Sequence, residues 1–475
     1  MMNFKYYFCT LVFAMLTASI WSSCSVSKNM PAPDMHLPAG FNNAAAVMDT
    51  NSISTVRWSD FFADQQLTNL ISKAIERNND LQIALKNIES AQLIFQQVSS
   101  ANLPALGLQA TSSINRPSDN SINSLNLKQS INTTHVQDYS LAAYISWEAD
   151  IWGKIKSQKA ASLASYLQTK EVRNVVQTRI VSEVAKGYYN LLMLDALLEI
   201  SEKNLRLNDS TVNIVKLQFD AGLVSALAVE QAVAQRLSSE ELIPAFQQRI
   251  TLQENAINLL IGEFPSSVQR TKKLSDYILP ERLSAGVPTE LLSHRPDVRA
   301  VEFELARSNA DVGYTKAQMY PSLTITALTG LDAFKASNWF NIPASLFGSA
   351  AANLTQPIFN QKKLRTQYEL AKIQRESSIV RFRQSVLVAV EEVSGALLKL
   401  DKLKAQQNIE AQRASTLRYA TVNSQLLFKN GLASYLEVLL AQGNVLQSEL
   451  QLANLQKERL DAMVDLYRSV GGGWK

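Results

Sequence analysis

The stretch FDAGLVSALAV at residues 219–229 recurs 209 residues later as FKNGLASYLEV at residues 428–438. The match extends in both directions without a gap, so that segment 183–262 falls on segment 392–471. Repetition over roughly eighty residues indicates two copies of one supersecondary unit, because the repeats of a solenoid are shorter. The sequence therefore predicts two related halves that share one body.

The repetition continues upstream after a small change of register. Asp80 and Pro104 correspond to Asp297 and Pro321 at the same internal spacing of 24 residues. Each half is interpreted as a helix, a strand, a loop, a strand, a long helix, a turn and a second long helix. The predicted boundaries are a first repeat at 58–266, a linker at 267–290 and a second repeat at 291–475.

Long helices are predicted where proline is missing. Residues 118–243 and 358–475 contain no proline and are rich in Ala, Leu, Gln, Glu, Lys and Ser, most of which favour helices. From Val386 to Leu400 the apolar residues are spaced by four and three, as in a helix that packs along a seam. Pro244 is expected to kink the helix that contains it. Helices are predicted at 153–219, 225–262, 295–319, 360–428 and 434–470.

Four short segments alternate between apolar residues and small or polar ones, which predicts strands with one apolar face. The Asn- and Ser-rich stretch 117–138 is expected to be an exposed loop. Such strands fit between lipid and water, and they also fit an ordinary antiparallel sheet with one exposed face. Because four strands cannot close on themselves, the chain is expected to oligomerise and so hide its sheet edges. The predicted strands are 104–116, 138–149, 321–331 and 346–358.

The N-terminus has the pattern of a targeting signal that ends at a cysteine. A positively charged start, an apolar core and small residues precede Cys24, so residues 1–23 are predicted to be a signal peptide. Cys24 would then be a lipidated first residue. Trp21 stands where bacterial lipoproteins usually carry Leu, and an ordinary secretory signal is the alternative. Since Cys9 would be removed with the signal, no internal disulfide or cysteine metal site is expected.

Composition and motifs exclude several other classes of protein. Beyond the signal, the sequence contains no run of 18 apolar residues, which is the length that a transmembrane helix needs. If the chain crosses a membrane, it is therefore expected to do so as a closed β-barrel. The formal charge of +4 is spread along the chain and predicts no nucleic-acid partner. The three histidines lie in unrelated contexts, and no phosphate loop, nucleophile motif or metal-ligand spacing occurs. The sequence therefore predicts no enzyme, no metal site and no cofactor.

Six short motifs follow one another along the chain. They are SWEADIWGK (146–154), LLSHRPD (291–297), YPSL (320–323), QPIF (356–359), GLASYLEVL (431–439) and LYRSVGGGW (466–474). With the duplication, they resemble the outer-membrane factor family of TolC/OprM-like channels, and in particular its lipoprotein branch that serves RND efflux pumps. The resemblance runs from Trp58 to the C-terminus.

The resemblance implies a fold that is mainly α with a small β part, built from a duplicated β-hairpin and long-helix unit. It implies a homotrimer whose α-barrel continues into a 12-stranded outer-membrane β-barrel, with four strands from each protomer, and an equatorial domain to which the linker 267–290 would belong. The implied partners are a periplasmic adaptor protein, an inner-membrane RND pump and outer-membrane lipid. Cys24 would anchor the chain in the outer membrane of a Gram-negative bacterium, and 24–57 would form a tether. The channel itself performs no reaction.

The two glycine turns are the predicted contacts with the adaptor. Each turn separates two long helices, glycine frees the backbone, and the serine that follows is suited to cap the next helix. A leucine at the apex of such a turn has no core to enter. A tight helix–helix turn without a partner is the alternative reading. The predicted contact residues are Gly222, Leu223, Ser225, Gly431, Leu432 and Ser434.

Just beyond the second turn, the resemblance implies a periplasmic gate at Tyr435, Leu436 and Leu440. Family members often carry Asp and then Arg one turn further on, whereas this chain has Leu440 and Gly443. An apolar constriction made by Leu436, to which Leu440 contributes if it faces the axis, is therefore predicted in place of an ionic one. Packing of Leu436 in a core is the alternative.

Two further sites are expected to be structural. Arg295 is predicted to order the loops around it, next to a helix that starts at Pro296. After the QPIF motif the family usually has two glycines, and here Gln361 and Lys362 occupy those positions. The bend between strand and helix is therefore expected to use different torsion angles.

These inferences predict the outer-membrane channel of a tripartite efflux system that exports drugs or other small toxic compounds. A TolC-like duct for type I protein secretion is the nearest alternative. A periplasmic coiled-coil scaffold without a pore is a rival from another class, but it would have no use for the four alternating segments.

Overall fold

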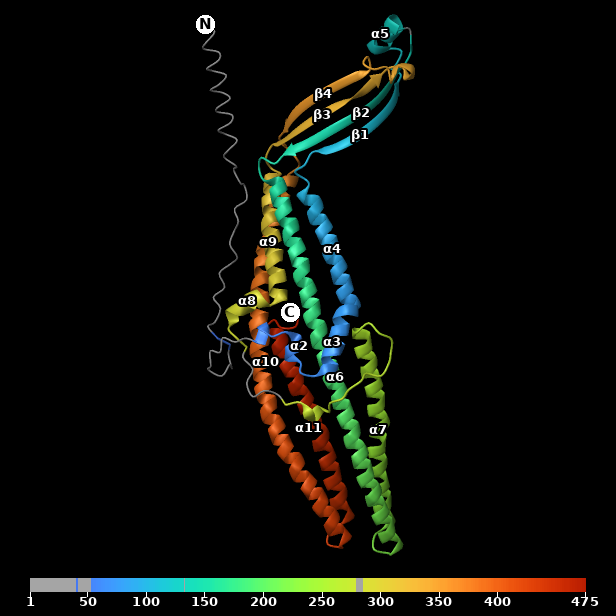
Figure 1. The fold of residues 1–475 in the computed structure, drawn as a ribbon, viewed down its shortest axis with the longest axis vertical. Coiled ribbons are helices and arrows are strands. Elements are labelled where there is room, and N and C mark those ends of the chain that lie inside the picture. The colour runs from blue at the N-terminus through green and yellow to red at the C-terminus, as the bar shows by residue number, and fades with distance from the viewer. Residues whose placement is uncertain (1–39, 42–52, 132, 279–284) are drawn as a thin grey trace. The chain divides into compact units, whose positions relative to one another are not determined.

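The computed structural model describes residues 40–41, 53–131, 133–278 and 285–475. The predicted signal peptide, Cys24 and most of the predicted tether lie outside these residues. The described chain is mainly helical with one small sheet, so the predicted fold class is confirmed (Figure 1). Apart from the N-terminal residues, one compact unit consists of Glu89–Leu167 with Phe303–Val380, and the other of Asp34–Ile88, Gln168–Glu302 and Arg381–Lys475. Both repeats contribute to both units.

The elements follow the repeat along the chain. The α-helices are α2 (Trp58–Phe61), α3 (Gln65–Arg77), α4 (Asn79–Ser99), α5 (Ile122–Ile131), α6 (Lys154–Asp220), α7 (Ala226–Leu260), α8 (Leu291–His294), α9 (Pro296–Ala317), α10 (Lys363–Lys429) and α11 (Tyr435–Ser469). The strands are β1 (Ala105–Asn115), β2 (Val136–Ala149), β3 (Ser322–Ala333) and β4 (Leu346–Thr355). Short 3-10 turns are η1 (Ile53–Thr55), η2 (Leu274–Asp276), η3 (Pro288–Glu290) and η4 (Ala336–Asn338).

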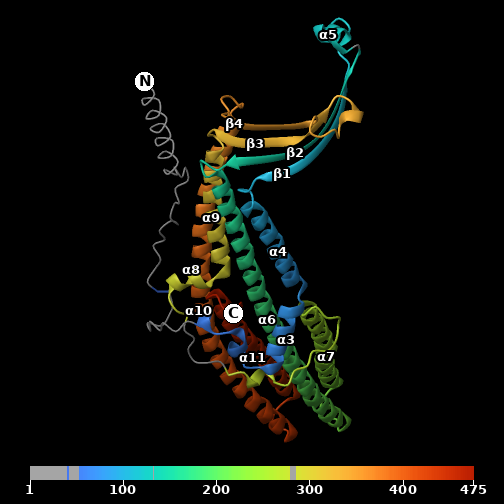
Figure 2. The same cartoon turned by 45° about the horizontal axis from the view of Figure 1, so that its top comes forward.

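In the first unit, the four strands form one antiparallel sheet in the order β1-β2-β3-β4, and the strands are visibly bowed (Figure 2). Leu106 lies opposite Ile145, and Ile145 lies opposite Ala327. Because the sheet is open, β1 and β4 each have one edge that pairs with no other strand of the described residues. β4 ends at Thr355, three residues before the predicted end, since Pro357 has no N–H group for the ladder.

The two faces of this sheet differ in polarity. Residues directly opposite one another share a face, so the register places Leu106, Leu108, Ile145 and other apolar residues on one side. Leu106 and Leu108 are exposed to 79% and 74%. The other side carries polar residues such as Gln109 and Thr111. The alternation in the sequence thus corresponds to one apolar and one polar face, and the apolar face is uncovered within the protomer.

The connection between β1 and β2 is predicted from the sequence to be an exposed loop at 117–138, but in the structure it is partly helical. It contains the ten-residue helix α5. The hydroxyl of Ser121, just before the helix, accepts a hydrogen bond from the N–H of Ser124 at 3.3 Å. Serine at a helix start satisfies an N–H that has no partner inside the helix. The many Ser and Asn residues of this stretch predict a loop, but one of them, Ser121, caps a helix.

The bend between β4 and α10 corrects a second expectation. Gln361 and Lys362 have φ angles of +45° and +63°, which lie in the left-handed region that glycine adopts most easily. The bend therefore keeps the backbone conformation that two glycines would favour. Left-handed conformations are disfavoured for residues with a Cβ, so this chain holds a strained turn at that position.

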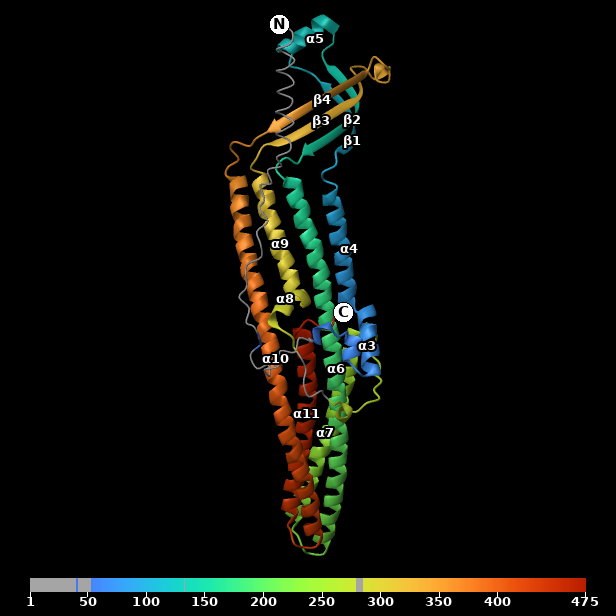
Figure 3. The same ribbon diagram turned by 60° about the vertical axis from the view of Figure 1, so that its left-hand side comes forward.

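The second unit contains the main hydrophobic core. Helices α3 and α4 place Leu67, Ile71 and Leu81 against residues of α6 such as Tyr188. Residues from α11, including Tyr467, complete this cluster. α6 and α7 run side by side to a shared turn, and so do α10 and α11 (Figures 1 and 3). Below, the lower part of α6 with α7 is called hairpin 1, and the lower part of α10 with α11 is called hairpin 2. α7 continues through Pro244 without interruption.

Both repeats end their last helix in the same way. The side chain of Asn78 donates to the carbonyl oxygen of Leu260 at 2.8 Å. At the equivalent place in the second repeat, Arg295 donates to the carbonyl oxygen of Ser469 at 3.1 Å. Helix C-termini leave carbonyl groups without partners. In each half, a side chain located just before α4 or α9 donates to one such carbonyl at the end of α7 or α11.

Among the described residues, Arg295 is the most buried cation that forms an ion pair. Only 4% of its side chain is exposed, and its guanidinium lies 2.6 Å from Asp297 and 2.7 Å from Glu392. Burial would raise the pKa of Asp297, but the hydrogen bond and charge of Arg295 hold this pKa below its ordinary value. Arg295 thus joins the start of α9, the middle of α10 and the end of α11, which confirms that it orders neighbouring segments.

We predict that Arg295→Gln destabilises the protein by about 2 kcal/mol, because the buried guanidinium loses its charge-assisted hydrogen bonds to Asp297 and Glu392. Chemical denaturation followed by circular dichroism measures the change. Arg383→Gln, an exposed arginine on α10, is the control and should have little effect. Since the pKa of Asp297 is depressed, its contribution persists down to about pH 4 and is lost only at lower pH. A stability equal to that of the control variant would contradict the role assigned to Arg295.

Candidate functional site

The turn of hairpin 1 is built by backbone hydrogen bonds around Gly222. The N–H of Leu223 donates to the carbonyl of Gln218 at 2.8 Å, and that of Gly222 to Phe219 at 2.8 Å. This pattern ends a helix with a left-handed residue, and Gly222 has a φ of +74°. Leu223 follows at the apex and is exposed to 73%. The turn therefore presents an apolar side chain that the protomer does not bury.

Hairpin 2 repeats this turn around Gly431, whose φ is +71°. The N–H of Leu432 donates to the carbonyl of Leu427 at 2.9 Å, and Leu432 is exposed to 75%. Ser434 begins α11 and contacts the carboxylate of Glu437 through its N–H at 3.4 Å and its hydroxyl at 3.3 Å. The two turns thus share the glycine conformation and the backbone hydrogen bonds, and their apex leucines have nearly the same exposure.

The two turns differ in how the next helix is capped. Ser225 occupies the capping position of α7, but its side chain makes no capping hydrogen bond. Three residues further on, hairpin 1 has Ala228 where hairpin 2 has Glu437. Because Ala228 has no side chain to reach back, the acid that completes the cap in hairpin 2 has no counterpart. Ala228 is instead buried between the hairpins.

A small apolar cluster joins the two hairpins near their turns. Phe428 and Val438 from hairpin 2 pack with Val212, Val215 and Ala228 from hairpin 1. Phe428 is only 4% exposed, whereas its counterpart in the first repeat, Phe219, is 44% exposed. The same residue type therefore has two roles, and only the second copy anchors the contact between hairpins.

The three predicted gate residues lie at the start of α11, but they are not equivalent. The hydroxyl of Tyr435 donates to the side chain of Gln231 on α7 at 2.7 Å, and its ring packs against the cluster between the hairpins. Leu436 and Leu440 are one helical turn apart and are exposed to 49% and 59%. Tyr435 therefore ties hairpin 2 to hairpin 1, while the two leucines form an uncovered apolar face that does not belong to the protomer's core.

This apolar face continues to Gly443. A side chain at Gly443 would meet nothing within 4 Å. The face from Leu436 to Gly443 thus carries no charged group at positions 440 and 443.

A buried polar layer lies next to these residues, and sequence reasoning did not identify it. The amide of Asn208 donates to Asn204 at 3.0 Å and to Ser239 at 2.7 Å. The amide of Gln442 on α11 donates to the hydroxyl of Thr211 on α6 at 2.9 Å. All five side chains are almost fully buried. Ser239 and Ser448 coincide in the repeat, which was the only signal of a buried polar position.

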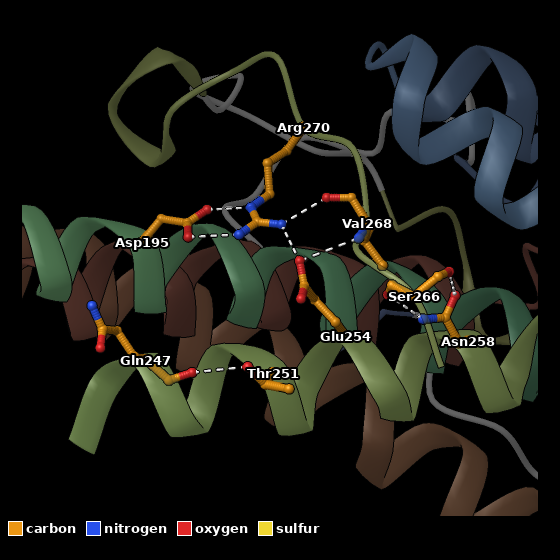
Figure 4. Close-up of polar contacts among 8 residues, drawn as sticks. All are labelled: Asp195, Gln247, Thr251, Glu254, Asn258, Ser266, Val268 and Arg270. Atoms are coloured by element: carbon orange, nitrogen blue, oxygen red, sulfur yellow. Dashed lines mark hydrogen bonds and ion pairs between the residues drawn. The ribbon is translucent and has the colours of Figure 1, made fainter. Parts of the chain in front are cut away.

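A second cluster that sequence reasoning missed holds residues 267–278, the first part of the predicted linker, against hairpin 1. Arg270 contacts Asp195 on α6 at 2.5 and 2.9 Å and Glu254 on α7 at 2.5 Å (Figure 4). It also donates to the carbonyl of Val268 at 2.6 Å. Hydrogen bonds to Asp195 hold the pKa of Arg270 above its ordinary value. One cation of the linker therefore fastens both helices of the hairpin together.

Other contacts lie just before the linker and along it. The amide of Asn258 donates to the carbonyl of Ser266 at 2.5 Å (Figure 4), and Lys273 pairs with Glu199 at 2.9 Å. Further on, Tyr277 donates to the buried carboxylate of Asp64. Residues 267–278 thus form a polar strap along hairpin 1.

No described residues form a group of three or more His, Cys, Asp or Glu side chains that could hold a metal ion. No helix in the described ranges combines the length and the apolar character needed to cross a membrane. Cys24 lies outside the described residues, so the structure places no part of the predicted lipid anchor.

The comparisons with known proteins agree with this geometry. The family model described as "Outer membrane efflux protein" matches residues 70–263 and 287–472. The cation efflux system protein CusC of Escherichia coli is 28% identical over 456 residues, covering 96% of each chain. The solvent efflux pump outer membrane protein SrpC of Pseudomonas putida is 29% identical and covers 90% of each chain. A crystal structure of CusC aligns with a TM-score of 0.84 at 27% identity, covering 95% of this chain and 100% of that one.

We predict that Tyr435→Phe loosens the contact between the hairpins. Loss of one hydrogen bond costs about 1 kcal/mol, so amides at the start of α11 should exchange with deuterium roughly five times faster where exchange follows local opening. Tyr419→Phe removes the hydroxyl of a tyrosine on α10 that is 72% exposed and serves as the control. Equal exchange in both variants would show that the Tyr435–Gln231 contact does not hold the hairpins together.

Proposed function

Because this chain belongs to the outer membrane efflux protein family, we propose that it is the trimeric exit duct through which drugs or other small toxic compounds leave the cell envelope. Members of this family are passive outer-membrane channels and not enzymes. The observation that supports the proposal best is the uncovered apolar face at the start of α11, next to exposed leucines at both turns. The relatives named above are efflux components, which favours efflux over the alternative of polypeptide secretion.

The open sheet supports the proposed trimer. β1 and β4 each leave one edge of N–H and C=O groups without a strand partner, and such edges pair readily with other chains. Edge-to-edge pairing of three copies would join the sheets and extend the apolar face around the outside. In this assembly we assign the linker 267–290 to the equatorial region between the two repeats, 58–266 and 291–475.

The N-terminal segment is proposed to hold the channel in the outer membrane. Cys24 would carry the lipid after removal of residues 1–23, and 24–57 would connect the lipid to the body. The motif in the sequence supports this assignment. Expression of Cys24→Ser followed by mass spectrometry of the mature N-terminus tests it, because a lipidated wild type and an unmodified variant are expected.

We further propose that the two turns bind a periplasmic adaptor, which connects the channel to an inner-membrane RND pump. Gly222 and Gly431 set the backbone of the turns, Ser225 and Ser434 begin the following helices, and the two apex leucines supply an apolar contact. Their exposure of 73% and 75% supports this proposal, since a leucine at the apex of a surface turn gains no burial within its own protomer.

The double variant Leu223→Asp/Leu432→Asp is expected to lose resistance in cells without loss of trimer. Burying an unpaired charge at an apolar contact costs about 2 kcal/mol, or roughly a thirtyfold loss of affinity for each site. Drug susceptibility and adaptor pull-down measure the effect. Leu259→Asp, a substitution at a leucine that is 74% exposed at the far end of α7, is the control. Undiminished efflux in the double variant would remove the turns from the adaptor contact.

The face of α11 supports an apolar constriction as the periplasmic gate. Leu436 and Leu440 point away from the core of the protomer, and no charged residue follows at Gly443. A ring of leucines around a pore closes it by excluding water. We propose that Leu436 makes the narrowest ring, that Leu440 adds a second, and that Tyr435 fixes the position of α11.

Leu436→Ser should therefore raise the single-channel conductance of the protein in a planar bilayer several-fold, because a smaller polar side chain admits water. Leu426→Ser removes a leucine that is 60% exposed on α10 and should leave the conductance unchanged. A current through Leu436→Ser that equals the wild-type current would place the constriction elsewhere.

A further inference from the structure

A cavity of about 590 Å³ lies under the strap, between hairpin 1 and hairpin 2. Its walls come from α6, from residues 270–275 of the strap, and from α10 and α11. The turns and the proposed gate do not line it. We propose that this cavity binds a single-chain anionic amphiphile, such as a fatty acid, with the acid group at Lys203 and Lys272 and the chain on the apolar floor.

The floor of the cavity is apolar and comes from two helices. Leu192, Ala196 and Ile200 are spaced by four residues on α6, so they lie along one stripe of that helix. Leu452 and Ala453 on α11 face the same space. Ligand pockets commonly have volumes of about 300–1,000 Å³ and are lined by apolar residues with a few polar groups. A narrow apolar floor of this kind fits an alkyl chain.

The charges around the cavity select an anion. Its acidic residues are Asp195, Glu199 and Glu449, and each of them is already paired with a cation of the wall: Arg270 at 2.5 Å, Lys273 at 2.9 Å and Arg418 at 2.5 Å.

Two further cations line the cavity, Lys203 and Lys272. Neither forms an ion pair within the described ranges, and the Lys272 ammonium lies 5.6 Å from the centre of the Tyr277 ring. The net charge of the wall is therefore positive, and the two lysines without an acidic partner are the groups that a carboxylate would meet.

Because the cavity lies between the two hairpins, a ligand bound in it would contact both of them. Asp195 and Ile200 belong to hairpin 1, whereas Arg418 and Leu452 belong to hairpin 2. A ligand that contacts both walls stabilises the arrangement in which they face each other. The inference is independent of the proposed adaptor and gate residues, since it concerns a different surface.

Photolabelling of the full-length trimer in phosphatidylcholine nanodiscs tests the site. A diazirine analogue of laurate should label peptides that contain residues 192–203 or 449–456, and unlabelled laurate should compete. The double variant Lys203→Gln/Lys272→Gln should weaken this competition about tenfold, because a charge-assisted contact is lost. Ala196→Phe, which fills the floor, should prevent labelling. The control Lys216→Gln/Lys404→Gln removes two lysines outside the cavity and should behave as the wild type.

Two competitors separate the chemistry of the site. Dodecyltrimethylammonium has the same chain with a positive head group and should compete poorly, and acetate, which lacks the chain, should not compete. Labelling elsewhere on the chain, competition by the cationic amphiphile equal to that by laurate, or equal binding in both lysine variants would each overturn the proposal. Efflux measured on the same variants shows separately whether the duct itself still works.

Discussion

The backbone N–H and C=O groups along β1 and β4 need partners that the described residues of one copy do not supply. Each edge of the open sheet exposes these groups, and the apolar face beside them exposes leucines such as Leu106. Burial of unpaired backbone groups in an apolar environment costs several kcal/mol for each group. The sheet therefore fits a lipid environment only when further strands complete it, and the proposed trimer follows from this requirement.

The helical unit meets a related constraint in a different way. A pair of long helices has too little interior to bury all its apolar residues, so each hairpin must pack laterally. Within the protomer, Phe428 and Val438 supply that contact near the turns. Tyr435 adds a hydrogen bond between the hairpins, and the polar strap holds hairpin 1 from outside. The leucines on the face of α11 remain uncovered, which leaves them for a surface around the proposed pore.

The duplication made the fold class and the order of elements predictable. Gly222 and Gly431 stand at equivalent positions, so the two turns could be identified without any structure. The repeat could not show how the copies differ, because that depends on which neighbours each copy meets. Phe219 and Phe428 coincide in the sequence, yet only the second is buried. Ser225 and Ser434 coincide as well, and the cap differs because Ala228 replaces an acid.

Long-range contacts explain what sequence reasoning missed. Arg270 lies 75 residues from Asp195, and nothing in the local pattern indicates which carboxylate it meets. The helix α5 escaped detection because Ser and Asn favour both loops and helix starts. At Gln361 and Lys362, the missing glycines suggested a different bend, but the flanking strand and helix fix the direction of the chain. The backbone then adopts left-handed angles at a local cost.

The buried polar layer shows how the hairpins keep their register. An apolar seam tolerates sliding, since methyl groups pack in many similar positions, whereas amides are satisfied in few geometries. The Gln442 amide meets Thr211, and Asn208 meets Ser239 across the two helices of hairpin 1. The side-chain carbonyl oxygens of Asn208 and Gln442 are buried without a hydrogen-bond partner in the described part of the chain. Each such group costs about 1–3 kcal/mol, so the layer defines the register of α11 but holds it less firmly than a fully satisfied network would. That balance suits a helix that carries the proposed gate, because its position is defined at rest while the two unsatisfied oxygens reduce the energy needed to displace it.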